Sequence, residues 1–198
     1  MNTISTTKIW DDQKYDTIID VRSPSEFDED HIPGALNLPV LDDKERMKIG
    51  TIYKKKSPFE AKVLGSSLIA KNISEHLTKS LKNKNGAWKP LVYCWRGGQR
   101  SKALCLIMQE IGWRVNQLEG GYKFYRNDIQ KKLQKLSPKL KIILISGKTG
   151  TGKTKLLNQI KSNNGQILDL EGIANHKGSL LGRDLKNNQP SQKLFESL

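Results

Sequence analysis

The chain has 198 residues, enough for one α/β domain and part of a second. Lys and Arg outnumber Asp and Glu by 34 to 20, and the formal charge of +14 favours a polyanionic partner such as nucleic acid over a basic protein that binds none. Two cysteines without metal-ligand spacing argue against a disulfide scaffold or a zinc site, and the lack of a long apolar run argues against a signal peptide or a membrane protein, so we expect a cytoplasmic location.

Predicted strands and helices alternate along the first part of the chain. Runs of β-branched and apolar residues predict strands at 17–22, within 31–39, at 90–95 and at 115–121. Apolar residues at three- and four-residue steps predict helices at 42–56, 58–82, 101–113 and 122–136. Ser23 or Ser25 is expected to cap a short helix through Glu26 and Phe27. This alternation predicts an α/β fold, with a parallel sheet covered by helices on both faces.

The alternation restarts after residue 138. KIILISG (141–147) predicts a strand, residues 148–165 a loop and a helix, and QILDLEG (166–172) another strand. Ser137-Pro138 interrupts the preceding helix, and we place the domain boundary there. Residues 1–137 are expected to form the first domain, and residues 138–198 the start of a second, incomplete one.

VYCWRGGQRS places Cys94 between a predicted strand and a predicted helix. Loop N–H groups and the positive end of the helix can surround an anion there and stabilise a thiolate, so Cys94 is the expected nucleophile. Arg100 offers a planar donor fork to a tetrahedral oxyanion, and Ser101 can bond the sulfur or cap the helix. The loop residues expected to bind substrate are Trp95, Arg96, Gly97, Gly98, Gln99, Arg100 and Ser101.

Two other interpretations of this loop stay open. The spacing from Cys94 to Arg100 matches the C-x5-R loop of cysteine phosphatases, although Tyr93 stands where those enzymes have a histidine and no nearby aspartate is an obvious general acid. Cys94 would otherwise be a structural cysteine, which the flanking glycines and arginines disfavour. Cys105 lies among leucine and isoleucine on the predicted helix and is expected to pack in the core.

GKTGTGKT fits the phosphate-binding pattern G-x-x-x-x-G-K-[ST], and it follows a predicted strand and opens a predicted helix. Lys153 would bridge phosphate oxygens, and Thr154 would reach a magnesium ion bound with them. Asp169 or Glu171 would meet that metal or a substrate hydroxyl, or else form a solvated acidic turn. The residues expected to bind phosphate are Gly147, Lys148, Thr149, Gly150, Thr151, Gly152, Lys153 and Thr154.

DVRSPSEFDEDHIPGALNLP (20–39) resembles the signature of rhodanese domains. The matching residues are Asp20, Arg22, Glu26, Phe27, His31, Ile32, Pro33, Gly34 and Ala35. We interpret most of them as scaffold. The resemblance implies a rhodanese-like parallel sheet, and a loop cysteine that carries sulfur or selenium as a persulfide or perselenide.

A rhodanese domain followed directly by a P-loop resembles the tRNA 2-selenouridine synthase family. The resemblance runs from about Ile18 to the last residue and rests on DVRSPSEF, NLPVLDDKERMKIGTIYKK, VYCWRGGQRS, LEGGYKFYR, ISGKTGTGKT, DLEGIANHKGS and QPSQKLFESL. It implies replacement of sulfur by selenium at the wobble 2-thiouridine of tRNA. Selenophosphate would be the selenium donor, a Cys94 perselenide the carrier, and an S-geranylated tRNA, made from geranyl diphosphate, an intermediate.

The residues themselves suggest a hypothesis for where each substrate binds, although any single lysine could instead be an ordinary solvated surface residue. The P-loop would hold the diphosphate of the geranyl donor, and basic residues would hold tRNA phosphates. The tRNA candidates are Lys54, Lys55, Lys56, Lys131, Lys132, Lys135 and Arg96. Trp95 would stack a base or pack in the core.

Residues 139–198 supply fewer strands than a P-loop domain needs. We therefore expect a truncated enzyme, or one half of a split pair that a second chain completes. A remnant that binds tRNA or a partner without catalysis is the third interpretation, beside the transferase and the phosphatase.

Overall fold

The computed structural model describes residues 3–10, 12–148, 150–177, 182 and 188–198. The chain divides into two units, Met1–Gln130 and Lys131–Leu198. The boundary falls within α5 (Gly121–Leu136), before the Ser137-Pro138 interruption at which the sequence places it. The other elements of the first unit are β1 (Thr6–Thr7), η1 (Asp12–Lys14), β2 (Thr17–Asp20), α1 (Pro24–Glu29), β3 (Leu36–Asn37), α2 (Asp43–Lys55), α3 (Pro58–Lys79), β4 (Pro90–Tyr93), α4 (Gln99–Ile111) and β5 (Asn116–Leu118).

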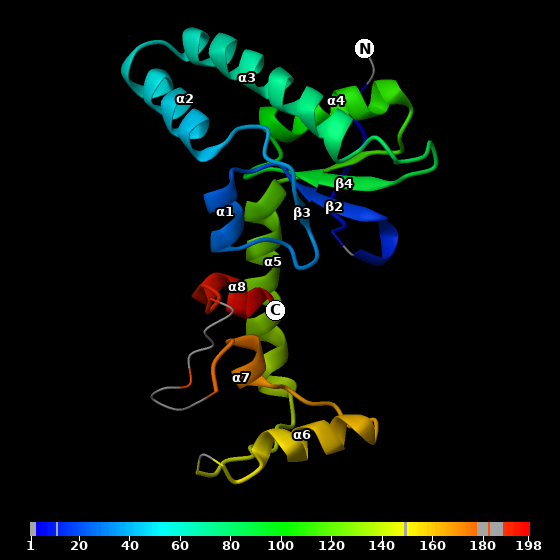
Figure 1. Ribbon diagram of the computed structural model, residues 1–198, viewed down its shortest axis with the longest axis vertical. Helices are drawn as coiled ribbons and strands as arrows, with labels where there is room; N and C mark the ends of the chain where they lie inside the picture. Colours follow the sequence, from blue (N-terminus) through cyan, green and yellow to red (C-terminus); the bar gives the residue numbers. More distant parts are fainter. Residues whose placement is uncertain (1–2, 11, 149, 178–181, 183–187) are drawn as a thin grey trace. The chain divides into compact units, whose positions relative to one another are not determined.

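The first unit is built on a five-stranded sheet of order β1-β5-β4-β2-β3, in which each neighbouring pair is parallel. Helices α3 and α4 cover one face of the sheet, and α1 and the start of α5 cover the other (Figure 1). The predicted rhodanese-like parallel α/β sheet is confirmed. Strand β1 escaped prediction because two threonines carry no periodic pattern.

Successive strand residues feed two separate cores, as the alternation of side chains along a strand requires. Ile19 and Val92 pack on the α3–α4 face, and Ile18 and Leu91 pack on the opposite face. Cys94 continues this alternation onto the α3–α4 side. The strand pattern therefore decides which way the loop cysteine faces.

Capping residues set the helix boundaries near the site. Asp42 caps α2 by accepting a hydrogen bond from the Glu45 N–H at 2.7 Å, while the Glu45 carboxylate accepts from the Asp42 N–H at 3.0 Å. Ser57 caps α3 and Pro58 begins it, so the predicted break between these two helices is confirmed. Of the two serines proposed to cap the short helix, Ser23 occupies the cap position of α1.

In the second unit the described residues form η2 (Ser137–Lys139), α6 (Lys153–Ser162), α7 (Leu170–Ile173) and α8 (Gln192–Ser197). Helix α6 confirms the helix predicted after the glycine-rich loop. The strands predicted at 141–147 and 166–172 are wrong, because neither segment is a strand in the structure and the second ends in α7. A strand needs a paired neighbour, and the side chains of Ile142, Ile143 and Leu144 are largely exposed rather than covered by a sheet.

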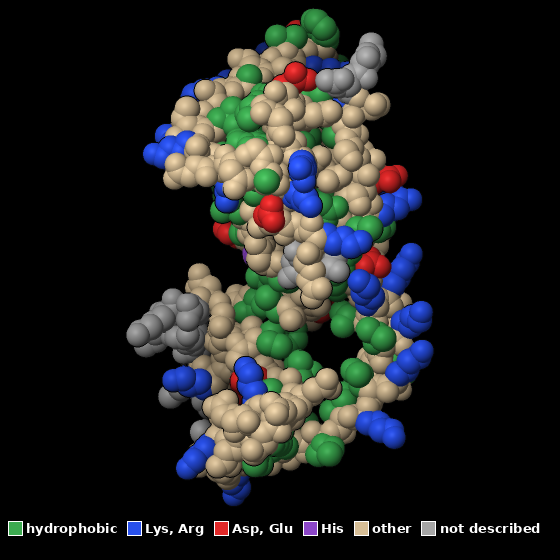
Figure 2. All heavy atoms as spheres, turned by 90° about the vertical axis from the view of Figure 1, so that its right-hand side faces the viewer, with side chains coloured by type: hydrophobic (Ala, Val, Ile, Leu, Met, Phe, Trp, Pro, Cys, Tyr) green, Lys and Arg blue, Asp and Glu red, His purple; other side chains and the backbone are tan. Residues whose placement is uncertain are grey.

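The excess of basic over acidic residues in the sequence is visible on the surface. Figure 2 shows Lys and Arg side chains scattered over the face it presents, with few Asp or Glu among them. Within the described residues, no helix combines the length and the apolar character that crossing a bilayer requires.

Arg22 and Asp20 form a buried ion pair at the carboxyl end of β2, with side chains 1% and 0% exposed. The Arg22 guanidinium donates to Asp20 Oδ2 at 2.6 Å and to the Asp30 carbonyl oxygen at 2.6 Å. It also lies 4.0 Å from the centre of the Tyr122 ring. One side chain thus joins β2, the end of α1 and the start of α5, which supports the interpretation of these signature residues as scaffold.

We expect Asp20→Asn to lower the free energy of unfolding by about 3–5 kcal/mol, because it leaves the buried Arg22 charge without a carboxylate. Urea unfolding followed by circular dichroism measures the change. The matched control is Glu75→Gln, which breaks an exposed i,i+4 pair with Lys79 and should change the stability far less, because water screens that pair. Equal losses in the two variants would contradict a scaffold role for the buried pair.

Candidate active site around Cys94

Cys94 follows the last residue of β4 and precedes the loop that leads into α4, at the carboxyl edge of the sheet. The residue is 3% exposed, whereas Gly98 and Gln99 in the same loop are exposed. Parallel strands gather their carboxyl ends at one edge, where open α/β sheets place their ligand sites. Cys94 therefore lies at the edge of the sheet where folds of this kind place ligand sites.

The Cys94 sulfur accepts two hydrogen bonds. The Gly98 N–H donates from 3.2 Å and the Ser101 hydroxyl from 3.1 Å. Donors aimed at one sulfur, together with the amino end of the 13-residue helix α4, favour negative charge there. The structure thus brings two of the predicted loop residues, Gly98 and Ser101, to the predicted nucleophile.

Gln117, on β5, holds this arrangement in place and was not predicted as a site residue. It is 5% exposed, and its side-chain amide donates to the Ser101 hydroxyl at 2.7 Å and to the Gly97 carbonyl oxygen at 2.9 Å. Because that amide occupies an acceptor position of Ser101, the hydroxyl proton is left for the Cys94 sulfur at 3.1 Å and the Gly98 carbonyl oxygen at 3.2 Å. A polar residue inside a short buried strand was the only available sequence signal.

Two glycines, Gly120 and Gly121, lie at the start of α5 and pack closely against the backbone of the cysteine loop. Gly121 has a φ of +56°, and a Cβ there would lie 2.6 Å from the Gly97 nitrogen and closer still to the Cys94 carbonyl oxygen. The Tyr122 N–H donates to that same carbonyl oxygen at 2.9 Å. Only glycine leaves room for this backbone contact. The segment LEGG therefore belongs to the site.

Arg100 does not point its fork at the sulfur. Its Nη1 and Nη2 donate to the two Glu26 carboxylate oxygens at 2.6 and 3.3 Å, and Arg46 Nε lies 3.9 Å from the same carboxylate. Burial raises the pKa of Glu26, but the hydrogen bonds and charge of Arg100 outweigh it, and the net pKa is lower than usual. Glu26, predicted as scaffold, is thus the partner of the predicted anion ligand.

The remaining loop residues lie around this centre. Trp95 is half-buried against the Tyr122 ring, with centroids 5.2 Å apart, whereas Arg96 is exposed. Cys105 is fully buried in the core as predicted, and burial, with a smaller effect of Cys94, raises its pKa to about 12. Cys105 is therefore an inert thiol at neutral pH.

The glycine-rich loop of the second unit contains Gly150 and Gly152 at positive φ, 85° and 82°, just before α6 begins at Lys153. The Lys153 ammonium donates to the carbonyl oxygens of Gly147 and Lys148 at 2.8 and 3.1 Å. The positions of Gly147, Lys148, Thr151 and the exposed Thr154 are described, whereas Thr149 lies outside the described residues.

Potential metal ligands near this loop can be assessed only among the residues that the structure describes. Among the described residues, no three His, Cys, Asp or Glu side chains gather so as to hold an ion. Asp169, proposed to meet a metal, accepts the Gly172 N–H at 3.0 Å and caps α7.

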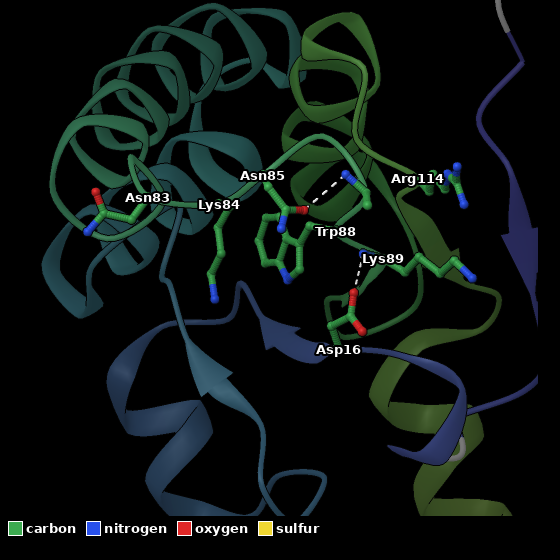
Figure 3. A pocket seen from close by; sticks show the side chains of 8 residues that line it. Asp16, Asn83, Lys84, Asn85, Trp88, Lys89 and Arg114 are labelled. Atoms are coloured by element: carbon green, nitrogen blue, oxygen red, sulfur yellow. Dashed lines mark hydrogen bonds between the residues drawn. The ribbon is translucent and has the colours of Figure 1, made fainter.

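A pocket of about 620 Å³ lies at the opposite, amino edge of the sheet. Its lining includes Asp16, Lys89 and Arg114, which precede β2, β4 and β5. Figure 3 shows the Asp16 carboxylate accepting the Lys89 N–H, at 2.8 Å, with Lys84 beside Trp88. Cys94 follows β4, so this pocket is not part of the cysteine site.

Comparison with known proteins agrees with this geometry. The Rhodanese-like domain family model matches residues 6–128, which is more than half of the chain. A parallel sheet with a cysteine loop between β4 and α4 is thus a rhodanese-like domain, and the chain belongs to that family. The N-terminal domain of a Clostridium difficile 630 protein of solved structure is 35% identical with a TM-score of 0.55, and the match covers 63% of this chain and 98% of that domain.

A second family model, the tRNA 2-selenouridine synthase AAA domain, matches residues 140–198. Relatives described as tRNA 2-selenouridine synthase occur in Sulfurovum sp. (strain NBC37-1), with 38% identity over 91% of this chain, and in Shewanella sp. (strain MR-7), with 37% identity over 97%. These matches cover 48% and 53% of the relatives, so the chain spans about half their length. It is a homologue of tRNA 2-selenouridine synthases that contains the rhodanese-like domain and part of the AAA domain.

We expect Gly121→Ala to destabilise the protein more than Gly112→Ala. Both positions have positive φ, but a Cβ at Gly112 meets nothing within 4 Å, whereas one at Gly121 meets the backbone of the cysteine loop. The Gly112 variant should lose about 1–3 kcal/mol of unfolding free energy from backbone strain alone, and the Gly121 variant clearly more. Thermal and urea unfolding of the two variants test this, and equal losses would contradict the close approach.

We expect Glu26→Gln to lower the free energy of unfolding at pH 7 by about 1–3 kcal/mol, because Arg100 loses a charged acceptor. A carboxylate with a lowered pKa stabilises the folded state above its unfolded pKa, and this contribution disappears as the pH falls through the folded value. The difference between wild type and variant should therefore shrink below about pH 4. The control is Glu60→Gln, at an exposed position of α3; a Glu26 difference that is constant with pH would refute the pairing.

Proposed function

We propose that this chain is the chalcogen-transfer part of a tRNA 2-selenouridine synthase, in which the Cys94 thiolate carries selenium or sulfur toward the wobble 2-thiouridine of tRNA. The observation that carries the proposal is the pair of donors, Gly98 N–H and Ser101 hydroxyl, that meet at one sulfur. Such donors stabilise a thiolate, and they would equally stabilise the anion of a persulfide or perselenide. The homologues supply the substrate class.

Transfer from a sulfane donor needs no further reagent. The thiolate attacks the outer sulfur of thiosulfate, an S–S bond forms, the donor's S–S bond breaks, and sulfite leaves with the electron pair. Selenosulfate reacts in the same way and leaves a perselenide. Selenophosphate contains selenium at the oxidation level of selenide, so forming a perselenide with release of phosphate also consumes a two-electron oxidant such as a disulfide.

The later steps return these electrons. The perselenide attacks C2 of the S-geranylated uridine, a C–Se bond forms, and the geranyl thiolate leaves. A small-molecule thiol then cleaves the S–Se bond, which leaves selenium on the base and a mixed disulfide on Cys94. That disulfide is the oxidant required by the next selenophosphate, and Cys105 is too deeply buried to act as the second thiol.

We place the geranyl diphosphate at the glycine-rich loop of the second unit. Backbone N–H groups of a loop with glycines at positive φ bind phosphate oxygens, and Lys153 needs only to exchange its loop carbonyl partners for phosphate. The match of residues 140–198 to the AAA domain of these synthases supports the assignment.

A cysteine phosphatase is the second candidate, and it has less support. That chemistry requires the arginine of the loop to bind the phosphoryl oxygens, whereas Arg100 directs Nη1 and Nη2 to the Glu26 carboxylate. Tyr93 is buried, and its hydroxyl accepts the Ile32 N–H at 3.1 Å, so it does not replace the missing histidine.

Intact-mass analysis after incubation with thiosulfate or selenosulfate tests the proposal. We expect one added sulfur or selenium atom in wild type and in the matched Cys105→Ala variant, and none in Cys94→Ser. An adduct that persists in Cys94→Ser would contradict the proposed role of Cys94 as the carrier. The lack of any adduct in wild type would contradict it as well. Hydrolysis of an aryl phosphate without any adduct would instead identify the phosphatase, and an adduct that leaves tRNA unchanged would show that the chain performs only the first half-reaction.

A further inference from the structure

Exposed lysines cluster where α2 ends and α3 begins, which we call the hairpin tip (residues 53–63). The side chains of Lys54, Lys55, Lys56 and Lys62 are exposed, against the single carboxylate of Glu60 in the same segment. Within the part of the chain that the structure describes, no acidic side chain forms an ion pair with any of these four lysines. The tip is therefore an uncompensated positive surface.

Two exposed aromatic rings lie among these lysines. Tyr53 is 56% exposed and Phe59 is 73% exposed, and Val63, one turn after Phe59 on the same face of α3, is 57% exposed. Single exposed apolar residues are ordinary, but aromatic rings interleaved with unpaired lysines form the combination that binds unstacked bases and their phosphates. The chemistry of the tip suits a single-stranded nucleic acid more than an apolar protein surface.

Helix α2 connects the tip to the cysteine site. Its first turn is fixed beside the site, because the Asp43 carboxylate accepts the Ser25 hydroxyl at 2.5 Å and Arg46 lies 3.9 Å from Glu26, the partner of Arg100. From Arg46 to Lys55 the helix rises about 14 Å. Figure 1 shows α2 and α3 side by side, with the turn that joins them standing away from the sheet. An RNA nucleotide at Cys94 would therefore have its neighbours within reach of the tip.

One face of α2 carries positive charge along this route. Lys44, Lys48 and Lys55 are exposed and separated by four and seven residues, so they share a face of the helix. Backbone phosphates between the site and the tip would meet these side chains. The charge continues from the first turn of α2 to its last.

We propose that the hairpin tip binds unpaired nucleotides of an RNA loop, with bases stacked on Tyr53 and Phe59 and phosphates neutralised by Lys54, Lys55 and Lys56. The proposal rests on the proposed function for its partner, an RNA with a reactive uridine. It adds the element that binds the RNA and the conformation that is bound. Duplex RNA fits poorly, because its bases are stacked inside the helix and its major groove is too narrow for side chains.

The test is binding of the full chain to a labelled RNA hairpin with an open loop, compared with a blunt RNA duplex, at several salt concentrations. We expect the chain to bind the RNA hairpin more tightly than the RNA duplex. Tyr53→Ala and Phe59→Ala should each weaken hairpin binding about tenfold and leave duplex binding unchanged. Joint replacement of Lys54, Lys55 and Lys56 by alanine should reduce the slope of log K against log salt by about 2.

Matched controls come from other exposed positions. Met47→Ala removes a 72% exposed apolar side chain of α2 outside the tip, and joint replacement of Lys82, Lys84 and Lys89 removes three exposed lysines near the amino edge of the sheet. Both sets of replacements should leave the preference for the RNA hairpin over the RNA duplex unchanged. Circular dichroism of every variant checks that it is folded.

The inference is overturned if Tyr53→Ala and Phe59→Ala bind the RNA hairpin like wild type, or if they weaken binding of the RNA hairpin and the RNA duplex equally. It is also overturned if Phe59→Ala abolishes self-association in sedimentation without affecting RNA affinity, which would assign the tip to a second copy of the chain. The outcome is separable from that of the proposed function. A Cys94 adduct without tip-dependent binding refutes only this inference, and tip-dependent binding without an adduct refutes only the carrier role.

Discussion

The geometry of the site depends on the interactions of one buried group, the guanidinium of Arg22. It bonds the Asp20 carboxylate at the end of β2 and the Asp30 carbonyl at the end of α1, and it lies against the Tyr122 ring at the start of α5. Tyr122 in turn donates its hydroxyl to Asp30 at 2.7 Å and its N–H to the Cys94 carbonyl. A buried charge tolerates only a narrow range of partner positions, because each lost bond leaves part of it uncompensated. The cysteine loop is therefore positioned by a charge that is itself buried away from the sulfur's hydrogen-bond donors.

The parts of this frame that depend on local sequence patterns were predictable. Contacts between residues distant in sequence were not. The strand-to-loop position of Cys94, the helices α2 and α3, and the serine cap of α1 all depend on near neighbours in sequence. Arg100 was expected to meet a substrate anion, yet Glu26, 74 residues earlier in sequence, holds it instead. That pairing follows from the adjacency of β2 and β4, which no local pattern reveals. The two strands expected after residue 140 failed for a related reason, since an apolar run forms a strand only where another strand pairs with it.

The pairing of Arg100 with Glu26 changes the electrostatics expected of the site. A free arginine would make the loop a strong site for any tetrahedral oxyanion. With its charge offset by Glu26, attraction for an anion falls to the loop amides, the amino end of α4 and the Ser101 hydroxyl that donates to the sulfur. These groups act on the sulfur and the atom bonded to it, rather than on the outer oxygens of a phosphoryl group. The arrangement suits a cysteine that holds a transferable atom more than one that attacks phosphorus.

Fixed spacing is what links this chemistry to recognition of a large substrate. Helix α2 is anchored at its first turn by Asp43 and Ser25, and it is held to α3 by Asn72, whose amide donates to the Glu45 carboxylate at 2.7 Å and to the Val40 carbonyl oxygen at 3.1 Å. A helix tethered in this way keeps the distance between its two ends, so a nucleotide bound at the hairpin tip and one placed at Cys94 are separated by a constant span. A fixed distance between these two points would select one position within an RNA loop by its distance from the bound nucleotides, without hydrogen bonds to the base edges. Specificity for one uridine would then come from geometry, and the weak sequence dependence of base stacking would be no obstacle.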